Sequence, residues 1–445
     1  MCSIDGLVAT PIVQMSQPVN VFLAAFFAKA LELPKTTIGV LTAIPFACNF
    51  LQIFISPFIA RWRSPQVISV IGAAGATVSW AALGLLLPFL PRHNPTATGH
   101  WLELWFFVTS MCGALAGVAW NAWIQEWVPG RVRGKYFGRR NGWLQFSVLI
   151  FLLGAGWTLA RWDYAMPAFQ AIIGAAVLLR LYSLYLIWAS PTPRPPRHHV
   201  TKLPLREQLA VLRADPALLL FIAFGSVWFF AANAFGPFYI VFLFEQLHFS
   251  ALDLGLFSTL SALGGGLSMP AWGRLLDRYG NKAVMAFSLI LWQGQNFLWC
   301  FLTPDNRNLS YAMWLWGGTT SAGFMLGQFT LLLKVIPVEA KNLAIGVNLA
   351  ITSLVAAIAP VLGGMALSWA LQHWPGHTLA VYHVCFLVQP VLAILGITLL
   401  LRLREPQASN FTSLVGAMRS IRTLSGIFGL SFLTDYIFYR APTKK

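Results

Sequence analysis

The chain has 445 residues, of which 57% are hydrophobic and only 10% are charged. This balance excludes a soluble protein of two or three domains. It also removes nucleic-acid binding as the explanation for the net charge of +16, because membrane orientation requires an excess of basic residues on one side. About 20 apolar residues cross a bilayer, so the length predicts about a dozen crossings and leaves no room for a soluble catalytic domain.

Apolar runs bounded by charged residues, proline or glycine predict the membrane spans in chain order. Six are expected at 7–31, 36–60, 65–90, 101–124, 141–161 and 165–189. After a polar, proline-rich stretch, six more are expected at 216–244, 252–272, 282–302, 309–334, 341–371 and 378–401. Backbone groups in hydrocarbon must be satisfied within their own segment, so all twelve are predicted to be helices.

The two halves of the chain resemble one another. "SPFIARW" (56–62) and "MPAWGRL" (269–275) each place proline and arginine four residues apart. The repeat predicts an N-terminal six-helix bundle at 1–189, a cytoplasmic linker at 190–215, a C-terminal six-helix bundle at 216–402 and a cytoplasmic tail at 403–445. Within the tail, residues 411–433 are apolar but interrupted by two arginines, which favours an interfacial helix over a thirteenth span.

Basic residues are distributed very unevenly between alternate loops. With the N-terminus inside, 24 of the 30 lysines and arginines fall on the inner side, five of them in "EWVPGRVRGKYFGRRN" (126–141). The asymmetry predicts a multi-pass protein with both termini in the cytoplasm. We expect the plasma membrane as its location, and a bacterial inner membrane in particular.

The loop "GRLLDRYGNK" (273–282) resembles the signature loop of the major facilitator superfamily. Gly273, Asp277, Arg278, Gly280 and Lys282 match the pattern, whereas Asn281 departs from it. With the twelve spans and the long central loop, the resemblance covers about residues 7–402. It implies an all-α membrane protein with 12 transmembrane helices in two pseudo-symmetric six-helix bundles. It also implies a secondary transporter that works by alternating access.

In this family the signature loop helps to latch the bundles on the cytoplasmic side. By analogy we expect the Asp277 side chain to contact the start of the fifth predicted helix (141–161). The alternative is that the charges of the signature loop only orient the loop. The equivalent first-half loop, "ARWRSP" (60–65), lacks the glycine and the aspartate, so the basic loop after helix 4 is expected to work with Asp277 or Glu126 instead. The predicted gating residues are Gly273, Asp277, Arg278, Gly280, Lys282, Glu126, Arg133, Arg139 and Arg140.

Helices 1, 4, 7 and 10 line the central cavity in this family, and helices 2, 5, 8 and 11 flank them. Polar residues there are mainly neutral amides mixed with aromatics, which suits a neutral, polyhydroxylated or amphipathic solute. For each single amide, a structural bond between helices is an equal alternative. The predicted substrate-binding residues are Gln14, Gln17, Asn20, Asn49, Gln52, Trp120, Asn121, Trp228, Asn233, Tyr239, Trp316, Gln328 and Asn348.

Charged residues inside the predicted spans are scarce. All 14 acidic residues fall in loops or near predicted helix ends. We therefore favour facilitated diffusion, or coupling through a helix-end carboxylate such as Glu103, Glu126 or Asp163, over a buried carboxylate relay. Arg180 is the one clear charge within a span. We expect its side chain to snorkel to the interface, with an inward contact to an anion as the alternative.

The sequence predicts a secondary transporter of a small organic solute, sugar-like or otherwise neutral or amphipathic. The alternatives are a transporter of a lipid or lysolipid, a transporter of a drug or metabolite, and a non-transporting assembly factor or receptor of the same fold. No motif of a membrane enzyme is present, so we expect no enzymatic activity, no cofactor and no metal. The expected partners are the substrate, the lipid bilayer and, for coupled transport, a proton or sodium ion. No nucleic acid is expected, and the protein is predicted to be a monomer.

Overall fold

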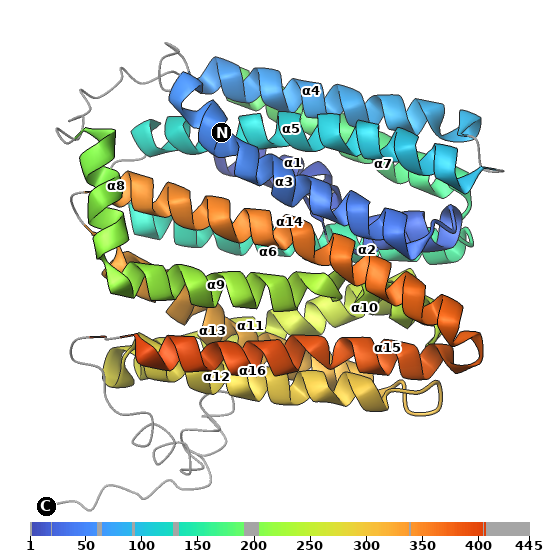
Figure 1. Ribbon diagram of the computed structural model, residues 1–445. Helices are drawn as coiled ribbons and strands as arrows, with labels where there is room; N and C mark the ends of the chain where they lie inside the picture. Colours follow the sequence, from blue (N-terminus) through green and yellow to red (C-terminus); the bar gives the residue numbers. More distant parts are fainter. Residues whose placement is uncertain are drawn as a thin grey trace, which may run out of the picture. The chain divides into compact units, whose positions relative to one another are not determined.

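A computed structural model describes residues 2–18, 20–59, 65–90, 94–127, 133–190, 204–337, 340–403 and 405. Over these ranges the chain consists almost entirely of helices joined by short turns (Figure 1). The helices coincide closely with the twelve predicted spans. The all-α membrane fold predicted from the sequence is therefore confirmed.

Seven helical segments form the described first half of the chain, and α1, α5 (from Pro95) and α6 (from Arg133) begin five to eight residues earlier than predicted. α1 starts at Cys2, five residues before the predicted start at residue 7, which places Asp5 inside a helix. The elements are α1 (Cys2–Met15), α2 (Val21–Ala24) with the π-helix η1 (Ala25–Ala30), α3 (Lys35–Ile59), α4 (Pro65–Leu86) with η2 (Leu87–Phe89), α5 (Pro95–Trp127), α6 (Arg133–Arg161) and α7 (Met166–Trp188).

The second half begins with a short helix that the sequence analysis did not predict, α8 (Leu205–Ala214), in the predicted linker. The remaining elements again match the predicted spans. They are α9 (Pro216–Ala234), α10 (Gly236–Glu245), α11 (Ala251–Tyr279), α12 (Asn281–Asn296) with η4 (Phe297–Phe301), α13 (Leu309–Val335), α14 (Lys341–His373), η6 (Pro375–His377), α15 (Thr378–Phe386) and α16 (Val388–Arg402).

Several described helices are long and apolar enough to cross a bilayer by length and composition alone. They are Pro65–Phe89, Pro95–Trp120, Met166–Trp188, Pro216–Glu245, Leu343–His373 and Pro375–Arg402. Shorter apolar helices cover Ile4–Met15, Val21–Ala30 and Phe146–Arg161. The protein is accordingly an integral, multi-pass membrane protein.

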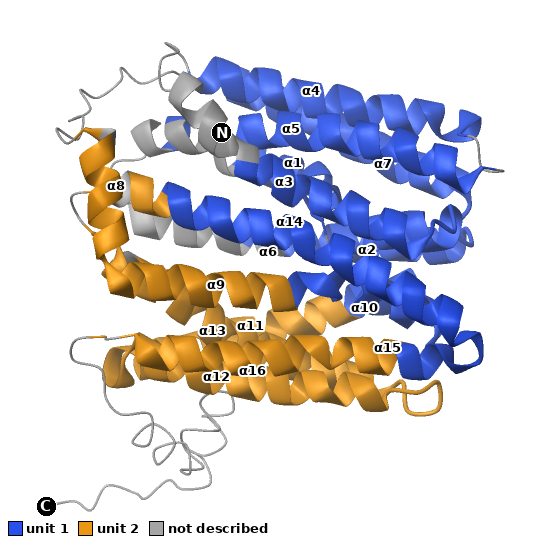
Figure 2. Ribbon diagram, in the orientation of Figure 1, with its two compact units in different colours: residues 1–202, 232–256, 346–381 blue, residues 203–231, 257–345, 382–445 orange. Residues whose placement is uncertain are grey.

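The chain divides into two compact units (Figure 2). Unit 1 comprises residues 1–202, 232–256 and 346–381, and unit 2 comprises residues 203–231, 257–345 and 382–445. The boundaries predicted for the two bundles, the linker and the tail stay a prediction, as does the cytoplasmic position of the termini. The interfacial helix predicted at 411–433 lies outside the described residues.

The first predicted span is interrupted between α1 and α2, and Asn20 stabilises the interruption. Its amide nitrogen donates to the backbone oxygens of Met15 (3.1 Å) and Gln17 (2.6 Å). Its amide oxygen accepts from the backbone N–H of Leu23 (2.8 Å) and so caps α2. Non-helical backbone is tolerated at membrane depth only when its polar groups are satisfied, and the Asn20 side chain satisfies three of them.

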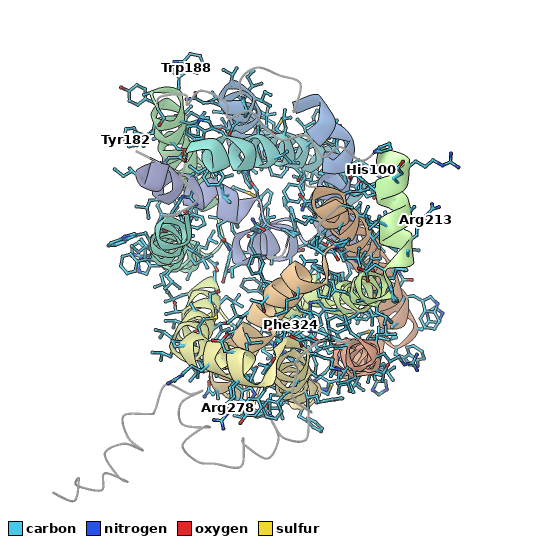
Figure 3. The ribbon with its side chains drawn as sticks, turned by 90° about the vertical axis from the view of Figure 1, so that its left-hand side faces the viewer. His100, Tyr182, Trp188, Arg213, Arg278 and Phe324 are labelled. Carbon is cyan, nitrogen blue, oxygen red and sulfur yellow. The ribbon has the colours of Figure 1, made fainter. Side chains whose placement is uncertain are left out.

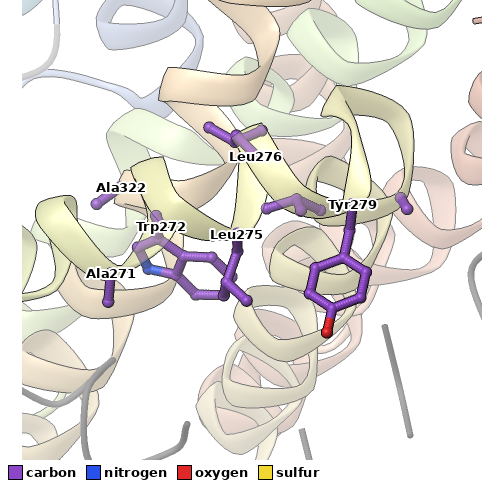
Figure 4. Packing of buried hydrophobic residues seen from close by; sticks show 8 residues of the cluster. Ala271, Trp272, Leu275, Leu276, Tyr279 and Ala322 are labelled. Carbon is purple, nitrogen blue, oxygen red and sulfur yellow. The ribbon is translucent and has the colours of Figure 1, made fainter. Parts of the chain in front are cut away.

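Unit 2 is held by close backbone approach between α11 and α13. A Cβ atom on Gly318 would lie 2.0 Å from the carbonyl oxygen of Ser261, and one on Gly264 would lie 2.3 Å from that of Leu315. Glycine at both positions lets the two helices touch, as expected for helices packed in lipid. Beside this contact, Trp272 is fully buried among Leu275, Leu276, Tyr279 and Ala322 (Figure 4). The second half of α11 is thereby fixed, and it includes residues 273–279 of the predicted signature loop, which are helical rather than a loop.

Candidate functional site

A cavity of about 520 Å³ lies within unit 1. Its size is that of a site for a small organic molecule. The helices α1, α3, α4, α5, α6 and α7 all contribute to its wall. The lining residues are Asp5, Gly6, Ala9, Thr10, Ile12, Val13, Ser16, Gln17, Pro18, Pro45, Asn49, Ser69, Ala73, Ala76, Thr109, Ser110, Gly113, Ala114, Ala116, Gly117, Trp120, Arg140, Leu144, Arg180 and Ile187.

Small residues on α4 and α5 make room for this cavity. Cβ atoms on Gly113 and Gly117 would meet no atom within 4 Å, so both glycines border open space. Ala73 and Ala76 of α4 also line the wall. The run "CGALAGVAW" in α5 thus leaves a helix face with few side-chain atoms beside the cavity.

Charged side chains from three helices meet at one end of the cavity. The hydroxyl of Ser183 donates to Oδ1 of Asp5 (2.5 Å), and Nη1 of Arg180 donates to that hydroxyl (2.9 Å). Arg180 and Arg140 both attract the Asp5 carboxylate electrostatically. Asp5 is the one acidic residue and the two arginines are the only basic residues among the described residues that line the cavity, so this end carries a net positive charge.

Arg180 faces the cavity, and the expectation that it snorkels to the membrane interface is wrong. Positions 176, 180, 183 and 187 lie on one face of α7, and Ala176, Ser183 and Ile187 are buried there. Tyr182 and Trp188, on the other side of the helix, are exposed and point outward (Figure 3). Arg180 lies on the inward face because the bond through Ser183 to Asp5 replaces contact with water.

Arg140 is held between an aromatic ring and a helix backbone. Its guanidinium carbon lies 4.5 Å from the centroid of the Trp120 ring, a cation–π contact. A Cβ atom on Gly6 would come within 2.5 Å of Nη2 of Arg140, so the guanidinium lies directly against the α1 backbone at this glycine. Trp120 and Asp5 both line the cavity beside Arg140.

Neutral polar groups stand among small apolar residues along the rest of the cavity. The Ser16 hydroxyl accepts from Nε1 of Trp80 (3.0 Å), while the Thr109 hydroxyl donates to the Trp105 carbonyl (2.8 Å). The buried hydroxyl of Ser110 has no hydrogen-bond partner among the described residues. A hydroxyl or amide of a bound solute would satisfy this group.

The cavity brings together only part of the predicted binding set. Gln17, Asn49 and Trp120 line it together with Arg140 and Arg180, whereas Gln14 does not. The side-chain amide of Asn20 bonds to the backbone and does not line the cavity. The predicted set omitted Asp5 and Ser110. A buried aspartate in the first turn of a membrane helix is a signal that an earlier predicted start of α1 would have revealed.

The other predicted binding residues are not among those that line this cavity. The Trp228 ring packs on Trp292 (5.0 Å between centroids) and Phe324 (4.8 Å), and Figure 3 shows Phe324 in the interior. Nε1 of Trp316 donates to the Leu291 carbonyl (3.3 Å). The predicted residues Asn233, Tyr239, Gln328 and Asn348 are partly buried. The side chains of Gln52 and Asn121 lie outside the described set.

The predicted signature loop makes a sharp turn between α11 and α12. Gly280 has φ 87°, a conformation that other residues rarely adopt. Asn281 and Lys282 follow Gly280, and their backbone N–H groups donate to the carboxylate of Glu405 (3.1 and 2.8 Å). Nζ of Lys282 donates to the Leu403 carbonyl (3.0 Å) at the end of α16. The loop is thereby attached to the chain segment that follows the last helix.

The remaining gating predictions are not tested by these contacts. Asp277 and Arg278 are exposed, and Arg278 points outward in Figure 3 with its guanidinium over the Tyr279 ring. Gly273 borders open space, with no atom within 4 Å of a Cβ placed there. The side chains of Glu126, Arg133 and Arg139 lie outside the described residues. The contact predicted between Asp277 and the start of α6 stays a prediction.

A family model described as Major Facilitator Superfamily matches residues 8–241 and 229–443. The chain belongs to the major facilitator superfamily. The two matches, one to each half, agree with the internal repeat seen in the sequence. The protein is therefore a membrane transporter of this family.

Known proteins of the family are distant from this chain in sequence. The MFS-type transporter opaD of Aspergillus ustus is 25% identical over 168 residues, which is 38% of this chain and 26% of that relative's length. A nucleoside transporter NupG mutant has a TM-score of 0.67 at 14% identity, covering 91% of this chain and 99% of that one. The inward-open xylose transporter XylE from E. coli has a TM-score of 0.65 at 12% identity, covering 93% and 98%.

A bacterial homologue of the human lysosomal transporter Spinster is also similar in fold. In its inward-facing, unoccupied conformation the TM-score is 0.64 at 14% identity, and the match covers 99% of this chain and 98% of that one. At such identities the likeness shows a shared fold and carries no information about the solute.

Proposed function

We propose that the protein is a secondary transporter that moves a small polar organic solute by alternating access, with the cavity of unit 1 as part of its solute site. The observation that carries the proposal is a cavity of about 520 Å³ inside a membrane bundle, lined by polar groups from six helices. A fold that served only as scaffold would fill such a space with side chains, because protein interiors are close-packed.

The interruption of the first span supports the same proposal. Ser16, Gln17 and Pro18, which lie between α1 and α2, all border the cavity. Transporters commonly place their solutes beside discontinuous helices, whose free backbone groups can contact the solute. Transport of nucleosides and xylose by structurally similar proteins is consistent with a polar organic solute.

The polar lining favours a polar solute over a lipid or a hydrophobic drug. Asp5, Arg140 and Arg180 occupy one end, and hydroxyl and amide groups are interspersed among apolar residues in the rest. An acyl chain would leave these groups desolvated and unpaired, which is costly. We further propose a monomer in a bacterial inner membrane with both termini in the cytoplasm, on the basis of the loop charges. Coupling to a proton or sodium ion is a subordinate hypothesis.

Uptake into proteoliposomes with a cavity-filling variant tests the proposal. Gly117→Leu places a large side chain in open space beside the cavity, and Gly174→Leu does the same on the exposed face of α7. A panel of labelled glucose, uridine, gluconate and lactate would be offered to both variants. We expect at least one compound to enter with the wild type and Gly174→Leu, and its uptake to fall at least tenfold with Gly117→Leu. Equal uptake by all three proteins would refute the assignment of the cavity.

A further inference from the structure

The charged end of the cavity holds more positive than negative charge. Asp5 faces Arg140 on α6 and Arg180 on α7, and with Ser183 and Trp120 it completes the described cluster. Arg180 lies inside the membrane span α7 (Met166–Trp188), where a charged side chain is costly. One carboxylate offsets one guanidinium, so the second has no acidic partner among the described lining residues. Such a charge is retained where a ligand neutralises it.

The two guanidinium groups also have unused donors. Of the five N–H donors of Arg180, only Nη1 has a described hydrogen bond, to Ser183. The Nε atoms of Arg140 and Arg180 are buried without a hydrogen-bond partner among the described residues. Buried donors without partners are rare in folded proteins and point to a missing acceptor. Oxygen atoms of a ligand's anionic group would supply it.

Both guanidinium groups are positioned before any ligand arrives. Trp120 and the backbone at Gly6 flank Arg140, while Ser183 fixes Arg180. A planar guanidinium matches the oxygen pair of a carboxylate or phosphate, and holding it in place reduces the entropy lost on binding. The arrangement suits an oxyanion better than a neutral hydroxyl.

We propose that Arg140 and Arg180 form an anion subsite and that the transported solute is a small organic anion, a carboxylate or a phosphate ester. This inference rests on the proposed transport function. Asp5 occupies the subsite as an internal counterion in the absence of solute, and the solute's anionic group competes with it. The neutral groups farther along the cavity, such as Asn49, Thr109 and Ser110, contact the uncharged remainder of the solute.

Binding of matched charged and neutral probes tests the subsite. Calorimetry on the full chain in micelles, at constant ionic strength, would compare acetate with acetamide and gluconate with glucose. We expect each anion to bind at least tenfold more tightly than its neutral partner. Arg140→Gln and Arg180→Gln should each reduce this preference at least tenfold. Arg161→Gln is the matched control, because Arg161 lies exposed at the other end of α6 and should leave binding unchanged.

Asp5→Asn distinguishes a binding site from a structural ion cluster. Removal of the internal competitor should raise the affinity for gluconate severalfold, a gain that misfolding cannot produce. If wild type and Asp5→Asn both bind gluconate no better than glucose, the anion subsite is refuted. Uptake of glucose or uridine that Gly117→Leu blocks would then leave the transport proposal standing. Conversely, anion binding by a protein that transports nothing would refute the transport function alone.

Discussion

The Glu405 carboxylate is expected to stabilise the start of α12, although 124 residues separate it from Asn281. Gly280 precedes the helix and supplies no side-chain cap. Glu405 is almost fully buried, with 2% of its side chain exposed, and it receives two backbone N–H groups and the ammonium of Lys334 (2.9 Å). It therefore acts as a helix cap supplied from the far end of the chain.

The contribution of Glu405 to the free energy of unfolding can be summed from its separate contacts. An N-terminal cap contributes about 1 kcal/mol, and a negative charge at a helix N-terminus adds about 0.3 to 1 kcal/mol. Lys334 is 56% exposed, so its ion pair adds at most about 1 kcal/mol. We expect Glu405→Ala to lower the free energy of unfolding by about 1 to 3 kcal/mol, the sum of these contributions. Glu405→Gln should cost less, because its amide oxygen can still accept one N–H bond.

The same contacts make the stabilisation by Glu405 dependent on pH. Burial raises the pKa of Glu405, but the bonds from Lys282, Lys334 and Asn281 outweigh burial and hold the pKa below its ordinary value of 4.5. Because the pKa in the folded state is depressed, the stabilisation is complete above the unfolded-state pKa. It is lost as the pH falls through the folded-state pKa. The difference between wild type and Glu405→Ala should therefore shrink below about pH 4.5.

Unfolding titrations with a denaturing detergent at pH 7 and pH 3.5 would measure both effects. Hydrogen exchange at the backbone amides of Asn281 and Lys282 would report the cap locally. Glu207→Gln is the control, since Glu207 is exposed on α8. The Glu405 cap is refuted if Glu405→Ala destabilises the protein no more than Glu207→Gln does. It is also refuted if the loss of stability is the same at pH 7 and pH 3.5.

Two further substitutions test other contacts. Gly318→Ala places a methyl group 2.0 Å from the Ser261 carbonyl oxygen and must separate α11 from α13, so we expect a clear drop in thermal stability. Gly266→Ala on α11, where a Cβ meets nothing within 4 Å, should leave stability nearly unchanged, and equal effects would contradict the packing described here. Lys35 and Glu245 form a partly buried ion pair between α3 and α10. Either Lys35→Glu or Glu245→Lys alone should lower stability, and the double exchange should restore at least half of the loss; a double variant no better than the singles would exclude a specific pair.

Most of the fold was predictable because a membrane restricts the choices. Apolar runs of sufficient length must become helices in hydrocarbon, so the positions of α3, α7 and α13 follow directly from the sequence. The turn at Gly280 was predictable for a similar reason, because the family motif requires a glycine there. The start of α1 at Cys2 departs from the apolar pattern because the first turn of this helix contains a charged residue, Asp5.

The sequence by itself thus determined the membrane class, the helices, the internal repeat and the family resemblance. Tertiary structure alone decided which side of each helix faces the interior. In lipid both faces of α7 are apolar, so the pattern could not show that Arg180 lies on the buried side. Only the approach of α1 and α6 brings Asp5 and Arg140 to the same place. Their meeting depends on long-range packing, which local apolar patterns do not encode.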